Sequence, residues 1–195
     1  MKDPKNIQII ICGKTGDKVL FPSKILGYAC ALSGKYCTLS PSIEPRIRGG
    51  LVFAELIVSD EKIDYPKTTD ADILIALSQG PYEIFAQPLR AGAGFAKKMA
   101  KKQAAIFYDP AHVKPDKSVA AKHYALPVVG KAAKELKTDK VNDTVLLSCV
   151  VRLTRIVSID ALNKALKANL KDELLTLNLK ALELGTRLAR KVRFP

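Results

Sequence analysis

The sequence predicts an α/β fold: a Rossmann-like, mostly parallel sheet flanked by helices, with a C-terminal helical segment packed on the sheet. Apolar runs at residues 7–12 and 71–77 are typical of strands whose two faces are both covered. After residue 128, apolar residues recur at helical spacing. We therefore expect one domain over residues 1–195, with a sheet core (1–128) and a helical part (129–195).

Composition narrows the class of protein. Hydrophobic residues make up 48% of the 195, which excludes a disordered chain. No apolar run reaches the length of a membrane span, and the first five residues lead into a strand rather than a signal peptide, so we expect a soluble, cytoplasmic protein. The four cysteines form no C-x-x-C pair and there are two histidines, so no zinc or iron–sulfur site is expected.

The net charge of +13 indicates a partner or ligand of opposite sign: a polyanion, an acidic protein or a phosphate-rich molecule. The densest basic cluster is Lys97, Lys98, Lys101 and Lys102, which we interpret as a solvated helix face. Aromatic residues make up only 6% and tryptophan is absent, so few platforms exist on which single-stranded bases could stack.

The first apolar run passes into the loop Gly13-Lys-Thr-Gly-Asp-Lys18. A loop at the carboxyl edge of a sheet that opens a helix directs backbone N–H groups outward, and Lys14 and Lys18 add positive charge. This chemistry suits an anion such as phosphate. The glycine spacing, however, fits neither the dinucleotide fingerprint nor a Walker A loop. The two glycines are equally explained by a turn that needs positive φ and binds no ligand.

The next segment reads as a helix with Pro22 in its first turn and Gly34 after its end, followed by a strand at 36–40. Together with the first strand it is expected to form a right-handed βαβ unit.

The loop at residues 41–50 carries Arg46 and Arg48 just before Gly49 and Gly50. A guanidinium there can present its fork to a phosphate or carboxylate close to the backbone. A turn with a solvated arginine is an equally good interpretation.

Further elements follow along the chain. Residues 51–59 and 71–77 are predicted strands, and the loop at 78–81 meets the first loop at the carboxyl edge, which makes a cleft plausible there. The remaining predictions are a helix at 82–102 interrupted by Pro88 and glycines, strands at 104–108 and 124–128, and helices beyond them.

In the helical part, Ser158 is positioned to cap a helix, with Asp160 in its first turn. The basic residues near the C-terminus, including Arg187 and Arg190, suit the end of the last helix dipole. We interpret His112 and His123 as exposed or packed residues, because no serine or cysteine pattern accompanies them.

Six blocks of sequence, in this order and spacing, resemble the gamma subunit of 2-oxoacid:ferredoxin (acceptor) oxidoreductases, the enzymes of pyruvate, 2-oxoglutarate and related acids. The resemblance covers nearly the whole chain. The blocks are residues 11–17 (ICGKTGD), 26–34 (LGYACALSG), 42–50 (SIEPRIRGG), 58–60 (VSD), 71–77 (ADILIAL) and 178–185 (NLKALELG).

The resemblance implies a non-catalytic subunit of a complex that oxidatively decarboxylates a 2-oxoacid to acyl-coenzyme A. Partner subunits would carry thiamine diphosphate and iron–sulfur clusters, and electrons would leave to ferredoxin or another acceptor. This chain would contribute to assembly and share the binding of coenzyme A. Neither a membrane nor nucleic acid is an expected partner.

The first loop departs from the family's G-x-G-G-Q-G pattern, since Thr15, Asp17 and Lys18 replace glycine, glutamine and glycine. In the second loop Arg46 stands in place of an acidic residue. The resemblance and the loops together give the candidate residues for coenzyme A, whose phosphates would meet the first loop and Arg48: Gly13, Lys14, Thr15, Gly16, Lys18, Arg46, Arg48, Gly49 and Gly50.

Three other interpretations remain open. The chain could be a purely structural subunit with a degenerate ligand loop. It could be a basic module for nucleic acid, although no basic recognition helix is visible. A free-standing nucleotide-dependent enzyme is the third, but no acidic ribose-binding residue ends the second strand.

Overall fold

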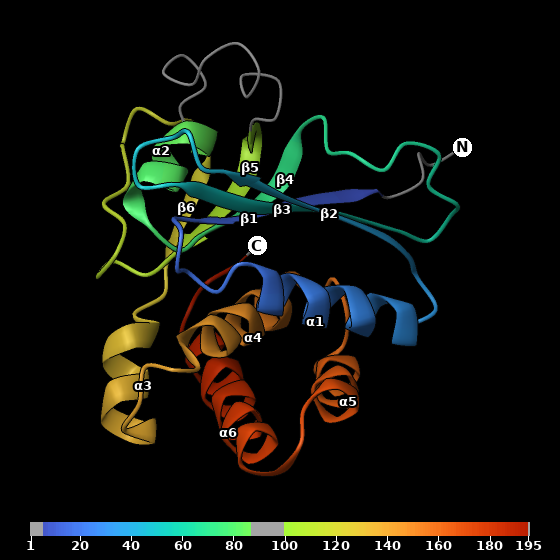
Figure 1. Ribbon diagram of the computed structural model, residues 1–195, viewed down its shortest axis with the longest axis vertical. Helices are drawn as coiled ribbons and strands as arrows, with labels where there is room; N and C mark the ends of the chain where they lie inside the picture. Colours follow the sequence, from blue (N-terminus) through green and yellow to red (C-terminus); the bar gives the residue numbers. More distant parts are fainter. Residues whose placement is uncertain (1–5, 87–99, 195) are drawn as a thin grey trace.

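A computed structural model describes residues 6–86 and 100–194 of the chain. Its centre is a six-stranded sheet of order β2-β3-β1-β4-β5-β6 (Figure 1). Five strands run in one direction and β3 runs against both of its neighbours, so the prediction of a mostly parallel sheet is confirmed. The strands are β1 (Ile7–Gly13), β2 (Tyr36–Glu44), β3 (Leu51–Ser59), β4 (Ala71–Ala76), β5 (Ala100–Tyr108) and β6 (Lys122–Ala125).

The helices cover the sheet unequally. α2 lies on one face, α1 and α4 lie on the other, and α6 packs chiefly against α4 and α5 chiefly against α1 (Figure 1). In the described residues no helix has the length and apolarity needed to cross a membrane. The helices are α1 (Leu20–Leu32), α2 (Gln79–Ala86), α3 (Val128–Leu136), α4 (Asn142–Thr154), α5 (Ile159–Asn169) and α6 (Asp172–Ala189).

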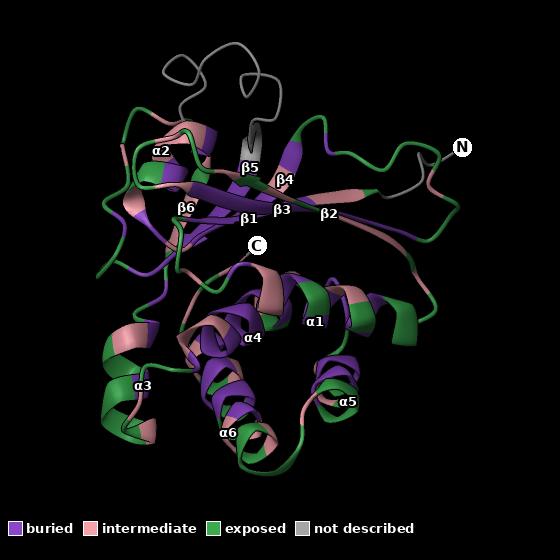
Figure 2. Cartoon of the chain, viewed as in Figure 1, coloured by how far each residue is buried: buried purple, intermediate pink, exposed green. Residues whose placement is uncertain are grey.

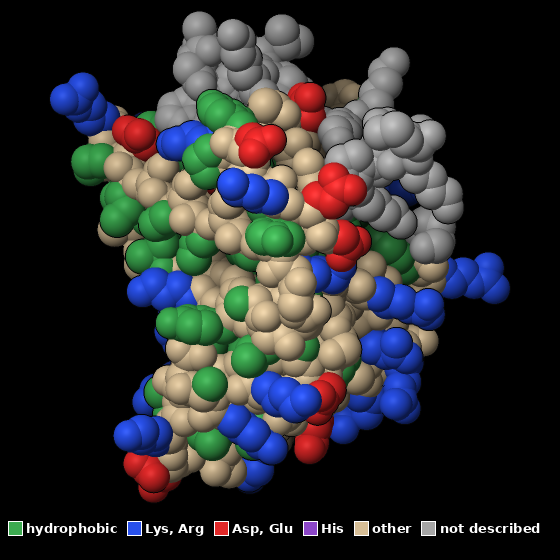
Figure 3. Space-filling view, turned by 90° about the vertical axis from the view of Figure 1, so that its right-hand side faces the viewer, with side chains coloured by type: hydrophobic (Ala, Val, Ile, Leu, Met, Phe, Trp, Pro, Cys, Tyr) green, Lys and Arg blue, Asp and Glu red, His purple; other side chains and the backbone are tan. Residues whose placement is uncertain are grey.

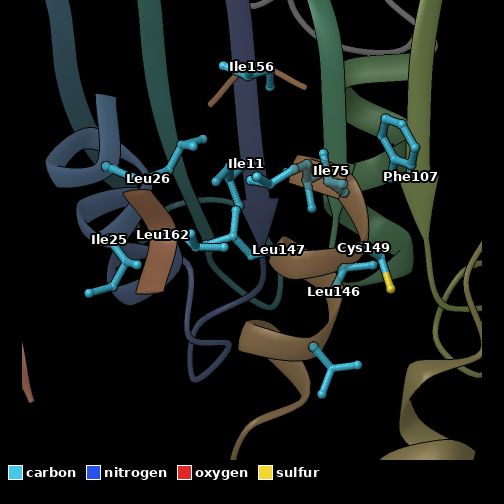
Figure 4. Close-up of a cluster of buried hydrophobic side chains, with 14 of the residues drawn as sticks. Ile11, Ile25, Leu26, Ile75, Phe107, Leu146, Leu147, Cys149, Ile156 and Leu162 are labelled. Carbon is cyan, nitrogen blue, oxygen red and sulfur yellow. The ribbon is translucent and has the colours of Figure 1, made fainter. Parts of the chain in front are cut away.

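The core consists of two apolar layers, one on each face of the sheet, and buried residues line both sides of the central strands (Figure 2). Alternate residues of β1 supply the two layers, because side chains along a strand point to opposite faces. Ile11 lies in the larger layer with Leu26 of α1 and Leu147 of α4 (Figure 4). Ile10 lies in the smaller layer with Phe85 of α2. Burial on both faces confirms the interpretation of the apolar run.

β1, α1 and β2 form the predicted βαβ connection between parallel strands of one sheet, but the two strands are not adjacent. β1 and β2 point the same way, but β3 lies between them and pairs with both. The predicted loop 41–50 is also shorter than expected, because β2 continues to Glu44. Pro41 fits inside this strand since β2 is at the edge of the sheet, where one side of the backbone has no hydrogen-bond partner to satisfy.

The segment predicted as a helix over 82–102 is divided. α2 already begins at Gln79, inside the predicted loop 78–81, and ends at Ala86. Residues 100–102 belong to β5, which pairs with β4, so pairing between distant segments overrides local helix preference. Lys101 and Lys102 therefore lie in a strand rather than on a helix face, and Lys97 and Lys98 lie outside the described residues.

The last strand of the sheet, β6, begins and ends earlier than predicted. β6 occupies residues 122–125 instead of 124–128, and Val128 already opens α3. Pro127, which cannot donate to a sheet, stands at the N-cap of α3. The predicted cap of α5 is confirmed, since Ser158 Oγ accepts a hydrogen bond from Ala161 N at 3.0 Å.

Gly185 allows α6 to lie directly against the backbone of α4. A Cβ at this position would lie 2.7 Å from Ser148 Cβ and closer still to the Val145 carbonyl oxygen. Gly27 in α1 has room by contrast, because the nearest atom to its Cβ would be Cys37 Sγ at 4.0 Å.

We expect Gly185→Ala to lower the free energy of unfolding by about 2 kcal/mol, because overpacking against backbone outweighs the gain in helix propensity. The matched substitution Gly27→Ala should raise it by up to about 1 kcal/mol. Urea unfolding of both variants measures the difference. Equal effects of the two substitutions would contradict close contact between α4 and α6.

Candidate functional site

Two loops far apart in sequence meet at the carboxyl edge of the sheet. One follows β1, and the other is the β2–β3 turn at residues 45–50, which lies at the same edge because β3 runs back along β1 (Figure 1, left). Thr15 N donates a hydrogen bond to Gly49 O at 3.3 Å. Gly50, at φ +69°, faces Thr15 so closely that a Cβ would collide with its hydroxyl.

Asp17 closes the first loop on itself. Lys14 N donates to Asp17 Oδ2 at 2.8 Å and to Ser78 Oγ at 2.9 Å, and Asp17 N donates to Lys14 O at 3.0 Å. The carboxylate thus accepts an amide hydrogen that a bound anion would otherwise accept. Since Thr15 N is also engaged, these two amides differ from the outward-facing N–H groups that the sequence predicts.

The two glycines of this loop have distinct structural roles. A Cβ at Gly13 would lie 2.7 Å from Asp17 Cβ and 2.9 Å from a methyl group of Val19, so a side chain there would displace the carboxylate. Gly16 adopts φ +97°, a conformation that favours glycine, and has open space around it.

A cavity of about 570 Å³, which we call the rim cavity, opens between the two loops and the start of α2. Lys14 and Arg48 bring two positive charges to it from different loops, and Ile47, Leu77 and Ile84 supply apolar wall. The full lining is Lys14, Asp17, Ile47, Arg48, Gly49, Gly50, Leu77, Ser78, Gln79, Gly80, Pro81, Glu83, Ile84 and His112.

A second cavity of about 280 Å³, the α4 cavity, adjoins the first and shares Asp17, Leu77 and His112 with it. The N-terminus of α4 contributes Asn142 and Asp143. Burial raises the pKa of the Asp143 carboxyl, and the positive charge of Lys18 opposes this shift. Lys18 itself donates to the Lys140 carbonyl, which holds its ammonium beside α4.

The structure divides the nine predicted site residues into three groups. Lys14, Arg48, Gly49 and Gly50 line the rim cavity, whereas Gly16 and Lys18 line the α4 cavity. Neither lining includes Gly13, Thr15 or Arg46. Gly13 and Thr15 shape the loops, and Arg46 is exposed on the β2–β3 turn.

Three residues of this edge were not predicted from the sequence. Ser78 Oγ accepts a hydrogen bond from Lys14 N, and His112 lines both cavities. Asp109, buried at the end of β5, accepts hydrogen bonds from Ala111 N and Val129 N, each at 2.7 Å, and so ties β5 to the start of α3. Ser78 and Asp109 both carried a signal, because each directly follows a predicted strand, whereas His112 carried none.

The described side chains of this edge provide charge and apolar surface that suit the binding of a ligand. Burial and the nearby Asp17 charge raise the pKa of the Cys12 thiol, so it is no thiolate nucleophile at neutral pH. Within the described ranges, no group of three or more His, Cys, Asp or Glu side chains is placed to hold a metal ion. What the edge offers is cations, glycine backbone and an apolar wall.

We expect Gly50→Ala to destabilise the protein by about 1–3 kcal/mol more than Gly49→Ala. Both residues have positive φ (+69° and +85°), but only the Cβ at position 50 would strike Thr15. Adding Thr15→Gly to Gly50→Ala should recover most of the extra loss, which thermal unfolding would measure. Equal losses for Gly49→Ala and Gly50→Ala would show that the loops do not press on each other.

Comparisons with known proteins agree with this architecture. The family model described as pyruvate ferredoxin/flavodoxin oxidoreductase matches residues 8–188. The 2-oxoglutarate synthase subunit KorC of Methanocaldococcus jannaschii is 30% identical over 188 residues, which are 95% of each chain.

Two solved structures share the fold. The gamma subunit of a keto/oxoacid ferredoxin oxidoreductase from Geobacter sulfurreducens PCA has a TM-score of 0.77 at 24% identity, with 95% of this chain and 99% of that chain covered. A 2-oxoglutarate:ferredoxin oxidoreductase from Magnetococcus marinus, with 2-oxoglutarate, coenzyme A and succinyl-CoA bound, has a TM-score of 0.80 at 22% identity, with 97% and 32% covered. The resemblance seen in the sequence is thereby confirmed: the chain belongs to the pyruvate ferredoxin/flavodoxin oxidoreductase family.

Proposed function

We propose that this chain is the subunit of a 2-oxoacid oxidoreductase complex that contributes the rim cavity to a coenzyme A site. The observation that carries the proposal is the convergence of Lys14 and Arg48, from two separate loops, on one cavity with an apolar wall. Its volume of about 570 Å³ lies in the range of small-molecule sites.

The lining residues fit the parts of coenzyme A. The Arg48 fork and the Lys14 ammonium suit phosphate oxygens, and Ile47 and Ile84 suit the pantetheine arm. The two acidic residues of the lining are engaged elsewhere: Asp17 holds the loop amide, and Glu83 Oε1 accepts from Gln79 Nε2 at 2.8 Å. The phosphates would therefore be held by side chains rather than by the backbone of the first loop.

The rest of the reaction belongs to other subunits in this proposal. They would carry thiamine diphosphate and the iron–sulfur clusters, and pass electrons to ferredoxin or another acceptor. Coenzyme A, when bound, supplies the thiol that takes the acyl group. The 2-oxoacid we propose is 2-oxoglutarate, because it is the acid named in the KorC relative that matches over 95% of this chain.

We expect Arg48→Ala to weaken the binding of coenzyme A at least about tenfold, because a hydrogen bond to a charged group contributes about 1.5–3 kcal/mol. Lys14→Ala should have a smaller effect, since an ammonium makes no bidentate contact. Isothermal titration of the full chain with coenzyme A, and the KM for coenzyme A in the assembled enzyme, measure both.

Arg46→Ala is the matched control. Arg46 lies two residues before Arg48 on the same turn but outside both cavities, so its removal should leave the affinity within about twofold. An Arg48→Ala variant that binds coenzyme A as tightly as the parent would remove the arginine from the site. Equal weakening in the two variants would mean that only the net charge matters.

A further inference from the structure

A third cavity, of about 830 Å³, lies away from the coenzyme A site. We call it the arginine cavity. α4 separates the two: its first residue, Asn142, lines the α4 cavity and Arg152, in its last turn, lines the arginine cavity. At about 1.5 Å per residue, the 13 residues of α4 span roughly 20 Å.

Three arginines without an ion pair in the described part of the chain converge there: Arg152, Arg155 and Arg190. They also line a neighbouring hollow of about 180 Å³, so their side chains lie between two concave surfaces. The other cations of the arginine cavity are already paired, Lys35 with Asp60 at 2.5 Å and Lys164 with Asp160 at 2.9 Å. Three like charges in one hollow create a positive potential that attracts an anionic group.

Helix dipoles account for part of this arrangement. Arg152 and Arg155 follow the end of α4, and Arg190 follows the end of α6, where cations are favourable. This effect acts within the last turn of each helix and gives no reason for three guanidinium groups to share one cavity with no free carboxylate among the described lining residues.

Large, half-exposed hydrophobic side chains lie in and next to the segment 32–35, which contributes Leu32, Ser33 and Lys35 to the same cavity; we call them its border. Tyr28, Leu32 and Tyr36 are 52%, 54% and 51% exposed. Leu32 lines the cavity, Tyr28 precedes it by one turn of α1, and Tyr36 opens β2 just beyond. Figure 3 presents this side of the molecule, with hydrophobic side chains among Lys and Arg over the helical half. Tyrosine and arginine are the residue types enriched at the energetic centres of protein interfaces.

We propose that the arginine cavity and its Tyr28–Leu32–Tyr36 border dock an acidic segment of another subunit of the complex. Carboxylates of that segment pair with Arg152, Arg155 and Arg190, and an apolar side chain covers Leu32. A small anion would satisfy the arginines but would leave the apolar border uncovered, which is why the occupant is a protein segment. The proposal rests on the proposed role as a subunit of a complex but not on the coenzyme A site, because the two sites share no residue.

The test is the affinity of the full chain for the remaining subunits of its oxidoreductase, produced together without it. Arg152→Glu with Arg155→Glu should weaken this affinity at least about tenfold and make it less sensitive to salt. Lys171→Glu with Lys180→Glu changes the net charge equally at exposed positions outside these cavities, and should alter the affinity less than about threefold.

Glutamate near the end of α4 also opposes the helix dipole, so Arg152→Gln with Arg155→Gln and Leu32→Ala serve as further variants, each checked for an unchanged melting temperature. Both should weaken assembly while leaving the affinity of the isolated chain for coenzyme A unchanged. Assembly equal to that of the parent would overturn the proposal. So would arginine-dependent binding of pyrophosphate without any effect on assembly, or self-association of the isolated chain through the same residues.

Discussion

The structure depends on one pairing: β3 inserts between β1 and β2 and runs against both. In the strand pairing, Phe53 of β3 lies opposite Cys12 of β1 on one side and opposite Ser42 of β2 on the other. All nine residues of β3 are buried, so the strand contributes to both apolar layers. Because β3 returns along β1, the turn before it is held at the carboxyl edge, where the loop after β1 also lies. The candidate site follows from this arrangement.

At that edge, the protein uses its backbone and its side chains differently from a glycine-rich phosphate loop. The Asp17 carboxylate accepts a hydrogen bond from Lys14 N, and the Gly49 carbonyl oxygen accepts one from Thr15 N. These contacts stabilise the conformation of the loop and satisfy two amide donors, which would otherwise need water or a ligand as a hydrogen-bond partner. In the coenzyme A site proposed above, the positive charge would come from the side chains of Lys14 and Arg48.

The two ends of α4 line different cavities. Its N-terminal end lines the α4 cavity, and Arg152 near its C-terminal end lines the separate arginine cavity. At Gly185 α6 lies directly against the backbone of α4, so the two helices are closely packed there. Part of the positive charge of the chain thus lies in the two cavities for which we propose an anionic ligand and an acidic partner.

The sequence by itself determined the elements whose signal is local. Apolar runs indicated strands covered on both faces, apolar stripes at helical spacing indicated the C-terminal helices, and Ser158 marked the start of a helix. The tertiary structure alone decided that residues 100–102 are strand, that β3 separates β1 from β2, and that Arg48 rather than Arg46 reaches a cavity. The physical reason is that strand pairing, and the direction in which a turn points its side chains, depend on contacts between residues far apart in the chain, whereas helix caps and burial patterns are encoded within a few neighbouring residues.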